Sequence, residues 1–366
     1  MNEPPLGASK EALDTPCLCL DLDVLEANIA AMVRTCRQHG VAWRPHAKGH
    51  KVPAIARRQI EAGALGVTCA KLGEAEVMAA GGVPDVLVAN MVVGPQKLAR
   101  LVELRRVADP IVCVDHPDQV RPISAAMAAA GLVLRVLIEV DIGLHRVGVP
   151  PGEPTLDLAR FVAAQPGVEL AGIMGYEGHL LTVPDQAEKS RRIAEALGSL
   201  VATARLLEAH GMPCEIVSCA GTGSYLHAVQ VPGITEIQAG GAIFMDAYYR
   251  HLCHVPELCY ALTLLTTVVS RPAPERAIID AGRKAMNIEI HPPLVVGRDD
   301  VRVGRLSAEH GQLELAPSAQ DLRIGDRLEL IPGYADLTTV LHNQFYCFRN
   351  GKLVDVWPLE ARGKLA

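Results

Sequence analysis

From residue 41 onwards, the chain repeats one pattern of hydrophobic and polar positions. A short apolar run leads into a loop rich in Gly, Asn or His, and an amphipathic stretch with helical periodicity follows. Eight apolar runs share this pattern, at residues 41–44, 66–70, 85–89, 111–114, 133–140, 168–172, 215–219 and 235–238. The helical stretches between them cover residues 52–62, 72–80, 96–107, 117–130, 154–164 and 185–210. Strands that alternate with helices pair in parallel, so eight such units predict a closed (β/α)8, TIM-like barrel.

An open, doubly wound sheet is the competing architecture for such a pattern. Its dinucleotide-binding form carries a G-x-G-x-x-G motif after the first strand, and no such motif follows residue 44 in this chain. The closed barrel is therefore the favoured interpretation.

After about residue 255 the pattern changes to short alternating runs that are typical of β-strands. These runs lie at residues 262–270, 276–280, 301–304, 326–331, 344–349 and 352–356. They predict an α/β barrel domain at residues 24–254 and an all-β domain at residues 255–366. A strand-like run at residues 18–20 precedes the first helix, so we expect the segment 1–23 to join the β domain.

Composition and charge narrow the possible functions. The chain has 366 residues, 49% of them hydrophobic and 21% charged, with a formal net charge of −6. This balance gives no basic surface for nucleic acid, and no apolar run approaches the ~20 residues that span a membrane. The ten cysteines are scattered without a CxxC spacing, and the first residues lack signal-peptide features. We expect reduced thiols in the cytoplasm and a small-molecule substrate.

The end of the first strand carries a candidate reactive amine. Lys48 stands between His46 and His50, directly after the Pro45-fixed strand end. A rigid element can aim a lysine at a carbonyl carbon, as imine-forming enzymes require.

Glycine-rich loops follow the seventh and eighth strands, where barrels of this kind often bind phosphate. The first loop runs from Ser218 through Gly221, Thr222 and Gly223, and the second contains Gly240 and Gly241. Their backbone N–H groups and the threonine hydroxyl can converge on phosphate oxygens. A lysine on one side of the barrel mouth and a phosphate site on the other suit pyridoxal 5'-phosphate.

The loops after the fifth and sixth strands add a cation, an aromatic ring and an imidazole. Arg146 follows a glycine turn, where it could contact a phenolate oxygen or a substrate carboxylate. Tyr176 and His179 share the next loop, and His179 is a candidate general base because imidazole titrates near neutrality.

Several motifs, taken in order, resemble those of one enzyme family. They are Arg-Pro-His-Ala-Lys-Gly-His-Lys at 44–51, Asp-Ile-Gly-Leu-His-Arg-Val-Gly at 141–148, Gly-Thr-Gly at 221–223, Ser-Ala-Glu-His-Gly at 307–311 and Trp-Pro-Leu-Glu-Ala-Arg-Gly at 357–363. From about residue 15 to 363, the chain resembles fold-type III pyridoxal-phosphate enzymes with an alanine-racemase-like barrel. More narrowly, it resembles the D-threonine aldolase and D-serine dehydratase family.

This resemblance implies roles for individual residues. Lys48 would form the imine with the cofactor, Arg146 would contact the cofactor's oxygen, and Tyr176 would lie beside its ring. The loop from Gly221 through Thr222 to Gly223 would hold the phosphate. The family also implies a homodimer in which the β domain completes the partner's site.

The chain departs from this family at the expected metal site. Relatives carry a histidine and then an aspartate or cysteine that bind a divalent ion, whereas this chain reads Pro-Gly-Tyr-Ala-Asp at residues 332–336. Asp336 is present, but Tyr334 replaces the histidine, and a neutral phenol is a poor ligand for Mn, Mg or Zn. Either metal affinity falls, or His342 substitutes, or the metal is lost. Tyr334 could instead donate a hydrogen bond to the substrate's hydroxyl or distal group.

The leading functional hypothesis is a lyase that cleaves the Cα–Cβ bond of a D-β-hydroxy amino acid. D-threonine or 3-hydroxy-D-aspartate would give a glycine-level product and an aldehyde. His179 would take the hydroxyl proton, directly or through water or a metal. A D-serine or D-threo-3-hydroxyaspartate type of dehydratase is the first alternative. An amino-acid racemase and a non-catalytic carrier of the cofactor follow.

Overall fold

The structure is a computed structural model that describes residues 4–366, and it divides into two compact units. The barrel unit comprises Met32–Gly240 and the last four residues, Gly363–Ala366. The β unit comprises Gly241–Arg362 and the chain up to Ala31, of which residues 1–3 lie outside the described range. The long helix α1 (Leu22–His39) runs through the division at residue 31.

The barrel unit contains eight parallel strands in the order β2-β9-β8-β7-β6-β5-β4-β3. They are β2 (Ala42–Trp43), β3 (Val67–Cys69), β4 (Asp85–Met91), β5 (Asp109–Val114), β6 (Leu134–Glu139), β7 (Val168–Met174), β8 (Ile216–Cys219) and β9 (Glu236–Ile237). Just beyond β2, His46 bridges Thr68 of β3 in parallel, and the Thr68 N–H donates to the Pro45 carbonyl at 2.9 Å. This bridge joins the two ends of the sheet. The predicted TIM-like barrel is confirmed.

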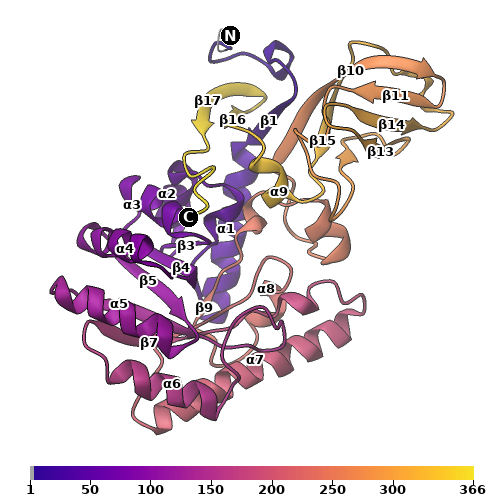
Figure 1. Ribbon diagram of the computed structural model, residues 1–366. Coiled ribbons are helices and arrows are strands. Elements are labelled where there is room, and N and C mark those ends of the chain that lie inside the picture. The colour runs from indigo at the N-terminus through magenta and orange to yellow at the C-terminus, as the bar shows by residue number, and fades with distance from the viewer. Residues whose placement is uncertain (1–3) are drawn as a thin grey trace. The chain divides into compact units, whose positions relative to one another are not determined.

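Helices cover the outside of these strands, as Figure 1 shows for α3 to α6. They are α2 (Pro53–Ala62), α3 (Leu72–Ala80), α4 (Pro95–Val107), α5 (Pro117–Ala129), α6 (Glu153–Ala163), α7 (Gln186–Ala209) and the short α8 (Tyr225–Ala228). Four of them have proline at the first or second position, where its missing N–H costs no helical hydrogen bond. The strands bury both faces, so they read as continuous apolar runs rather than alternating ones.

Charged side chains form a network among the barrel strands. Arg44, which is 1% exposed, donates from Nε to Glu236 at 2.8 Å and also pairs with Asp85. Arg135 pairs with Asp109 and lies 3.8 Å from Asp85. Because a buried charge is costly unless it is paired, these contacts fix the register of the strands that carry them.

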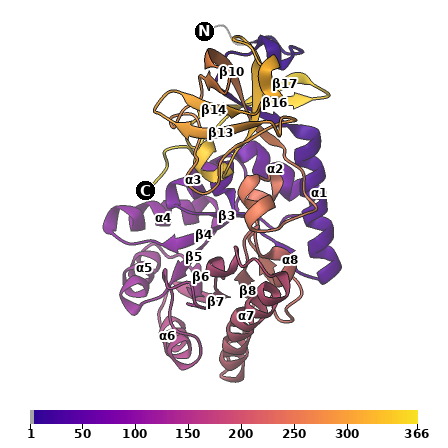
Figure 2. The same cartoon turned by 90° about the vertical axis from the view of Figure 1, so that its right-hand side faces the viewer.

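The β unit is built on a closed antiparallel sheet. Its strands follow the order β11-β14-β13-β12-β15-β10, and β10 also pairs with β11. They are β10 (Leu262–Ala273), β11 (Arg276–Ile279), β12 (Leu294–Val295), β13 (Val301–Leu306), β14 (Gly311–Leu315) and β15 (Arg327–Ile331). Figure 2 shows β13 and β14 side by side in this unit, and an antiparallel ladder joins them. The predicted all-β C-terminal architecture is confirmed.

Three more strands extend this sheet from β10. The N-terminal strand β1 (Cys17–Asp21) runs antiparallel to β10 and parallel to β16 (Gln344–Arg349), which pairs with β17 (Lys352–Pro358). Strands β12 and β14 and the short helix α9 (Ala335–Thr339) were not predicted from the sequence. Across residues 4–366, no helix is long and apolar enough to cross a membrane.

Candidate active site

Lys48 lies beyond β2, which ends at Trp43, in a 3-10 turn over Ala47–Gly49. Its backbone N–H donates to Nδ1 of His46 at 3.3 Å, and the His46 N–H donates to the Gln238 carbonyl at 3.1 Å. Burial and then the positive charge of Lys48 lower the pKa of His46, which keeps the imidazole neutral and able to accept this bond. These contacts hold the lysine segment at the strand ends of the barrel, and its covalent role stays a prediction.

The second lysine of the motif has a different environment. Lys51 is 6% exposed, and its ammonium pairs with Glu74, which also accepts the backbone N–H groups of Ala70 and Lys71 at 2.7 and 2.9 Å. This pairing neutralises Lys51. His50 is also buried, and loss of solvent lowers its pKa to about 3. Lys51 is therefore held in a buried ion pair, and the imine with Lys48 stays a prediction.

The Gly-Thr-Gly loop presents a hydroxyl group that lacks a partner. Thr222 is 2% exposed, and its Oγ1 has no hydrogen-bond partner among residues 4–366. The N–H of Gly221 donates to Oγ of Ser224 at 3.1 Å, which closes the turn. A buried hydroxyl without a partner is costly, so a bound anionic oxygen would stabilise it. The loop therefore fits a phosphate group.

The second glycine loop touches the segment that carries the lysine. A Cβ atom at Gly240 would lie 2.1 Å from the carbonyl oxygen of His46, so only glycine fits there. The loop after β9 therefore contacts His46, which precedes Lys48 by two positions in the sequence. Gly241 begins the β unit, where a Cβ would lie 2.5 Å from the ring of Tyr249.

Tyr176 lies between the Gly-Thr-Gly loop and Arg146. A Cβ at Gly221 would lie 2.9 Å from Oη of Tyr176, and the Arg146 guanidinium lies 5.6 Å from the centre of the tyrosine ring. Arg146 also donates to Glu139 at 3.3 Å, at the end of β6. Burial raises the pKa of Glu139, opposed by the charge of Arg146. The structure thus brings together three of the predicted cofactor contacts.

His179 lies in the neighbouring loop, against the backbone of Gly143. Asp141 shapes that turn by accepting the N–H groups of Gly143 and His145, both at 3.0 Å. Gly143 has a φ of +116°, and a Cβ there would lie 2.9 Å from Nε2 of His179. Burial, followed by the charge of Arg192, lowers the pKa of His179. The imidazole is therefore neutral near pH 7 and can accept a proton.

Ser218 differs from the other predicted phosphate contacts because its hydroxyl group is already used. It is fully buried, donates to Glu236 at 2.8 Å and accepts from Nε2 of Gln238 at 2.9 Å. These two hydrogen bonds tie the end of β8 to the end of β9, next to the Gly-Thr-Gly loop. A direct phosphate contact by Ser218 stays a prediction.

In the β unit, Tyr334 and Asp336 form a hydrogen-bonded pair. The phenol Oη of Tyr334 donates to Oδ2 of Asp336 at 3.0 Å, and its ring packs against Tyr248 and Tyr249 at centroid distances of 5.4 and 5.9 Å. The buried carboxyl of Asp246 accepts the N–H groups of Ala335 and Tyr249, both at 2.9 Å. Burial raises the pKa of Asp246 to about 8. The sequence analysis missed Asp246.

The candidate metal ligands do not assemble into a cation site. Nε2 of His342 donates to the Ala285 carbonyl at 2.7 Å, which leaves only Nδ1 as a possible ligand atom. Over the described chain, no three His, Cys, Asp or Glu side chains form a group that could hold a metal ion. Tyr334 and Asp336 alone are a poor donor set for a divalent cation. A role for His342 stays a prediction.

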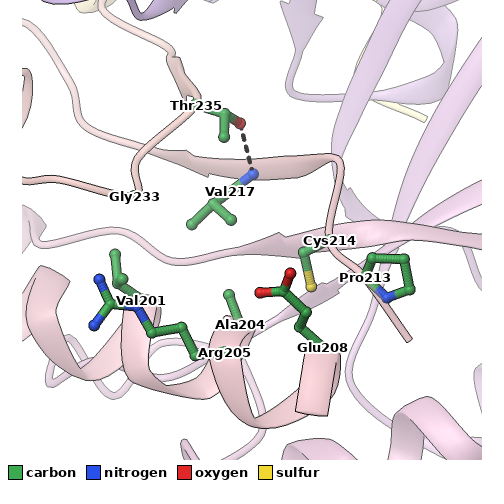
Figure 3. A pocket seen from close by; sticks show the side chains of 9 residues that line it. All are labelled: Val201, Ala204, Arg205, Glu208, Pro213, Cys214, Val217, Gly233 and Thr235. Carbon is green, nitrogen blue, oxygen red and sulfur yellow. Dashed lines mark hydrogen bonds between the residues drawn. The ribbon is translucent and has the colours of Figure 1, made fainter. Parts of the chain in front are cut away.

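A cavity of about 200 Å³ lies on the outer wall of the barrel (Figure 3). Residues of α7 and of the segments around β8 and β9 line it, where Thr235 Oγ1 accepts the Val217 N–H at 2.8 Å. None of the predicted site residues lines this cavity. The predicted catalytic and cofactor-binding residues of the barrel lie in the loops at the strand ends instead.

Comparisons with known proteins agree with this barrel fold. Residues 20–248 match the family described as alanine racemase, N-terminal domain, and residues 261–348 match the putative serine dehydratase domain. The chain therefore belongs to the alanine-racemase-like class of barrel proteins.

Individual relatives narrow this class. A D-threonine aldolase of Arthrobacter sp. is 40% identical over 96% of this chain and 93% of its own length. A 3-hydroxy-D-aspartate aldolase of Paracoccus denitrificans is 37% identical over 98% and 94%. The crystal structure of D-threonine aldolase from Filomicrobium marinum superposes with a TM-score of 0.96 at 38% identity, covering 99% of this chain and 100% of that one. Within the class, the protein is a member of the D-threonine aldolase family, which confirms the resemblance seen in the sequence.

Proposed function

We propose that the protein is a pyridoxal-phosphate-dependent lyase that cleaves the Cα–Cβ bond of a D-β-hydroxy amino acid. The observation that carries this proposal is the strand-end arrangement of Lys48, Gly240 and the buried, unpartnered hydroxyl of Thr222. Relatives named D-threonine aldolase and 3-hydroxy-D-aspartate aldolase support the reaction type. A D-threo-3-hydroxyaspartate dehydratase of Delftia sp. is 30% identical over 94% of the chain and 97% of its own length, so elimination is the alternative outcome.

The residues of the site fit the cofactor. Lys48 would hold it covalently, and the Gly221–Gly223 loop would bind its phosphate through the Thr222 hydroxyl. Tyr176 and Arg146 would contact the cofactor's ring and its phenolate oxygen. When bound, the cofactor's pyridine ring supplies an electron sink for the broken bond. Gly240 keeps the second loop close to the lysine segment.

His179 would handle the proton of the substrate's β-hydroxyl group. Its lowered pKa leaves a neutral imidazole that can accept this proton as the Cα–Cβ bond breaks and an aldehyde forms. The other product from D-threonine would be glycine. Tyr334 would contact the substrate hydroxyl or its distal group.

Product analysis tests this function. The purified protein, loaded with pyridoxal phosphate, would be incubated separately with D-threonine, 3-hydroxy-D-aspartate, D-serine and D-alanine, with L-threonine as the stereochemical control. We expect glycine with acetaldehyde from D-threonine, and nothing from L-threonine. A keto acid with ammonia would indicate a dehydratase, L-alanine a racemase, and no turnover a carrier.

We also propose that the chain acts as a cytoplasmic homodimer in which the β unit completes the partner's site. The ten free cysteines of the chain are consistent with a reducing compartment. Light scattering coupled to size-exclusion chromatography tests the dimer, because a monomer of 39.1 kDa would contradict it.

The Thr222→Val substitution should weaken cofactor binding without changing the shape of the loop. The hydroxyl is buried and has no protein partner, so its loss affects the holoenzyme more than the apoenzyme. We expect a loss of about 1–3 kcal/mol of binding free energy, as for one hydrogen bond to a charged group. Titration of the apoenzyme with pyridoxal phosphate measures this change, and an unchanged affinity would leave the loop as an ordinary turn.

Chelation should lower the activity only modestly, because Tyr334 stands where the family motif leads us to expect a metal-binding histidine. If EDTA abolishes the activity and manganese restores it, then Asp336 still holds an ion with another ligand, and His342 is the first candidate. In Tyr334→His, we expect manganese affinity to rise at least about 10-fold. Metal analysis of the untreated parent and of the variant, side by side, measures both effects. A stoichiometric divalent ion in the parent would refute the metal-free interpretation.

A further inference from the structure

Glu177 has an unusual environment in the barrel unit. Its carboxyl group is completely buried, between Tyr176 and Gly178 in the loop after β7. Oε1 accepts the hydroxyl of Ser224, and Oε2 lies 3.4 Å from the N–H of Ala220. A buried carboxyl without an opposite charge is costly, and burial accordingly raises its pKa. Because burying this carboxyl group is costly, its hydrogen-bond partners should show why Glu177 is present.

Ser224 connects this carboxyl group to the phosphate loop. Its Oγ accepts the N–H of Gly221 at 3.1 Å while it donates to Glu177. A hydroxyl group has a single proton, and the competing acceptor, the Gly221 carbonyl, lies farther away at 3.3 Å. Glu177 therefore fixes the orientation of the hydroxyl, and the hydroxyl fixes the Gly221 end of the loop.

We infer that Glu177 is a positioning residue that holds the Gly221–Gly223 loop, through Ser224, in the conformation that receives the phosphate. Glu177 follows Tyr176 directly, and a Cβ atom at Gly221 would lie 2.9 Å from Oη of Tyr176. The same short segment thus places the tyrosine and the loop relative to each other. This inference rests on the proposed function, because it assumes that the loop receives the cofactor's phosphate.

The loop also leaves Thr222 free for the ligand. With the Gly221 N–H satisfied inside the protein, the unpartnered Thr222 hydroxyl is the side-chain donor that stays available. Loss of the Glu177–Ser224 contact would release the Gly221 N–H and let the loop adopt other conformations. The cost would appear mainly as weaker binding, because binding must then select one conformation.

Two variants test this inference in the full-length protein. Ser224→Ala removes the link, and Glu177→Gln keeps the size of the side chain but removes its charge. Ser124→Ala is the matched control, because Ser124 is a buried serine of α5 whose hydroxyl donates to the Pro166 carbonyl at 2.6 Å. The measurements are the pyridoxal-phosphate dissociation constant, the phosphorus NMR signal of the bound cofactor, and the thermal unfolding midpoint of each apoenzyme.

We expect cofactor affinity to fall about 10-fold in Ser224→Ala and less in Glu177→Gln, with a shifted or broadened phosphorus signal in both. Ser124→Ala should lower only the unfolding midpoint. Affinities and signals equal to the parent's in both variants would overturn the inference, and so would an equal loss in the control. If Ser224→Ala does not fold, Glu177→Gln decides alone. A parent that binds no pyridoxal phosphate would instead contradict the proposed function.

Discussion

Lys48→Ala should abolish both the visible absorbance of the cofactor-loaded protein and its activity. Lys51, the other lysine of the motif, is held in a buried ion pair with Glu74, and the His46 contact fixes the turn that carries Lys48. Without its amine, the protein loses the covalent link to the cofactor and a proton carrier at the reacting carbon. We expect the turnover number to fall on the order of 10³-fold or more. Absorbance spectra and borohydride bleaching, followed by product assays, measure the loss.

Lys48→Arg is the control for charge in this experiment. It keeps a cation on the same turn but offers no amine for an imine, so it should behave like Lys48→Ala. Weak, non-covalent cofactor binding should persist in both variants through the Thr222 loop. A visible band that survives in Lys48→Ala and bleaches with borohydride would show that another lysine forms the imine.

The barrel could be predicted from the sequence because its signal is local and repeated. Each buried parallel strand reads as a short apolar run, and each helix between strands has its own periodicity. Even β2 and β9, which have only two residues each, were found because polar and glycine-rich loops follow them. In the β unit, β12 was missed because two residues carry no alternation, and β14 because its run includes Gly311 and Gln312.

The partners of site residues were less predictable, because they depend on contacts between distant parts of the chain. Lys51 and Glu74 pair across 23 positions and Glu177 and Ser224 across 47, and no spacing rule links such residues. Asp246 accepts a backbone N–H 89 positions away. The sequence could assign Lys48 and Thr222 to loops on the same face of the barrel, because the ends of parallel strands meet there. It could not show that the Ser218 hydroxyl is occupied by Glu236 and Gln238.

Gly240→Ala should destabilise the barrel unit and reduce cofactor loading together. The new methyl carbon would lie 2.1 Å from the His46 carbonyl oxygen, and backbone, unlike a flexible side chain, cannot move aside cheaply. The loop after β9 or the Lys48 segment must shift, and we expect a loss of about 3 kcal/mol or more. The matched control is Gly198→Ala, in helix α7, where a Cβ meets no atom within 4 Å. That substitution should stabilise the protein by about 0.5–1 kcal/mol, because glycine is the poorer helix former. Thermal unfolding and cofactor occupancy of both variants measure the difference. A Gly240→Ala protein as stable and as fully loaded as the control would show that the two segments do not need this close approach.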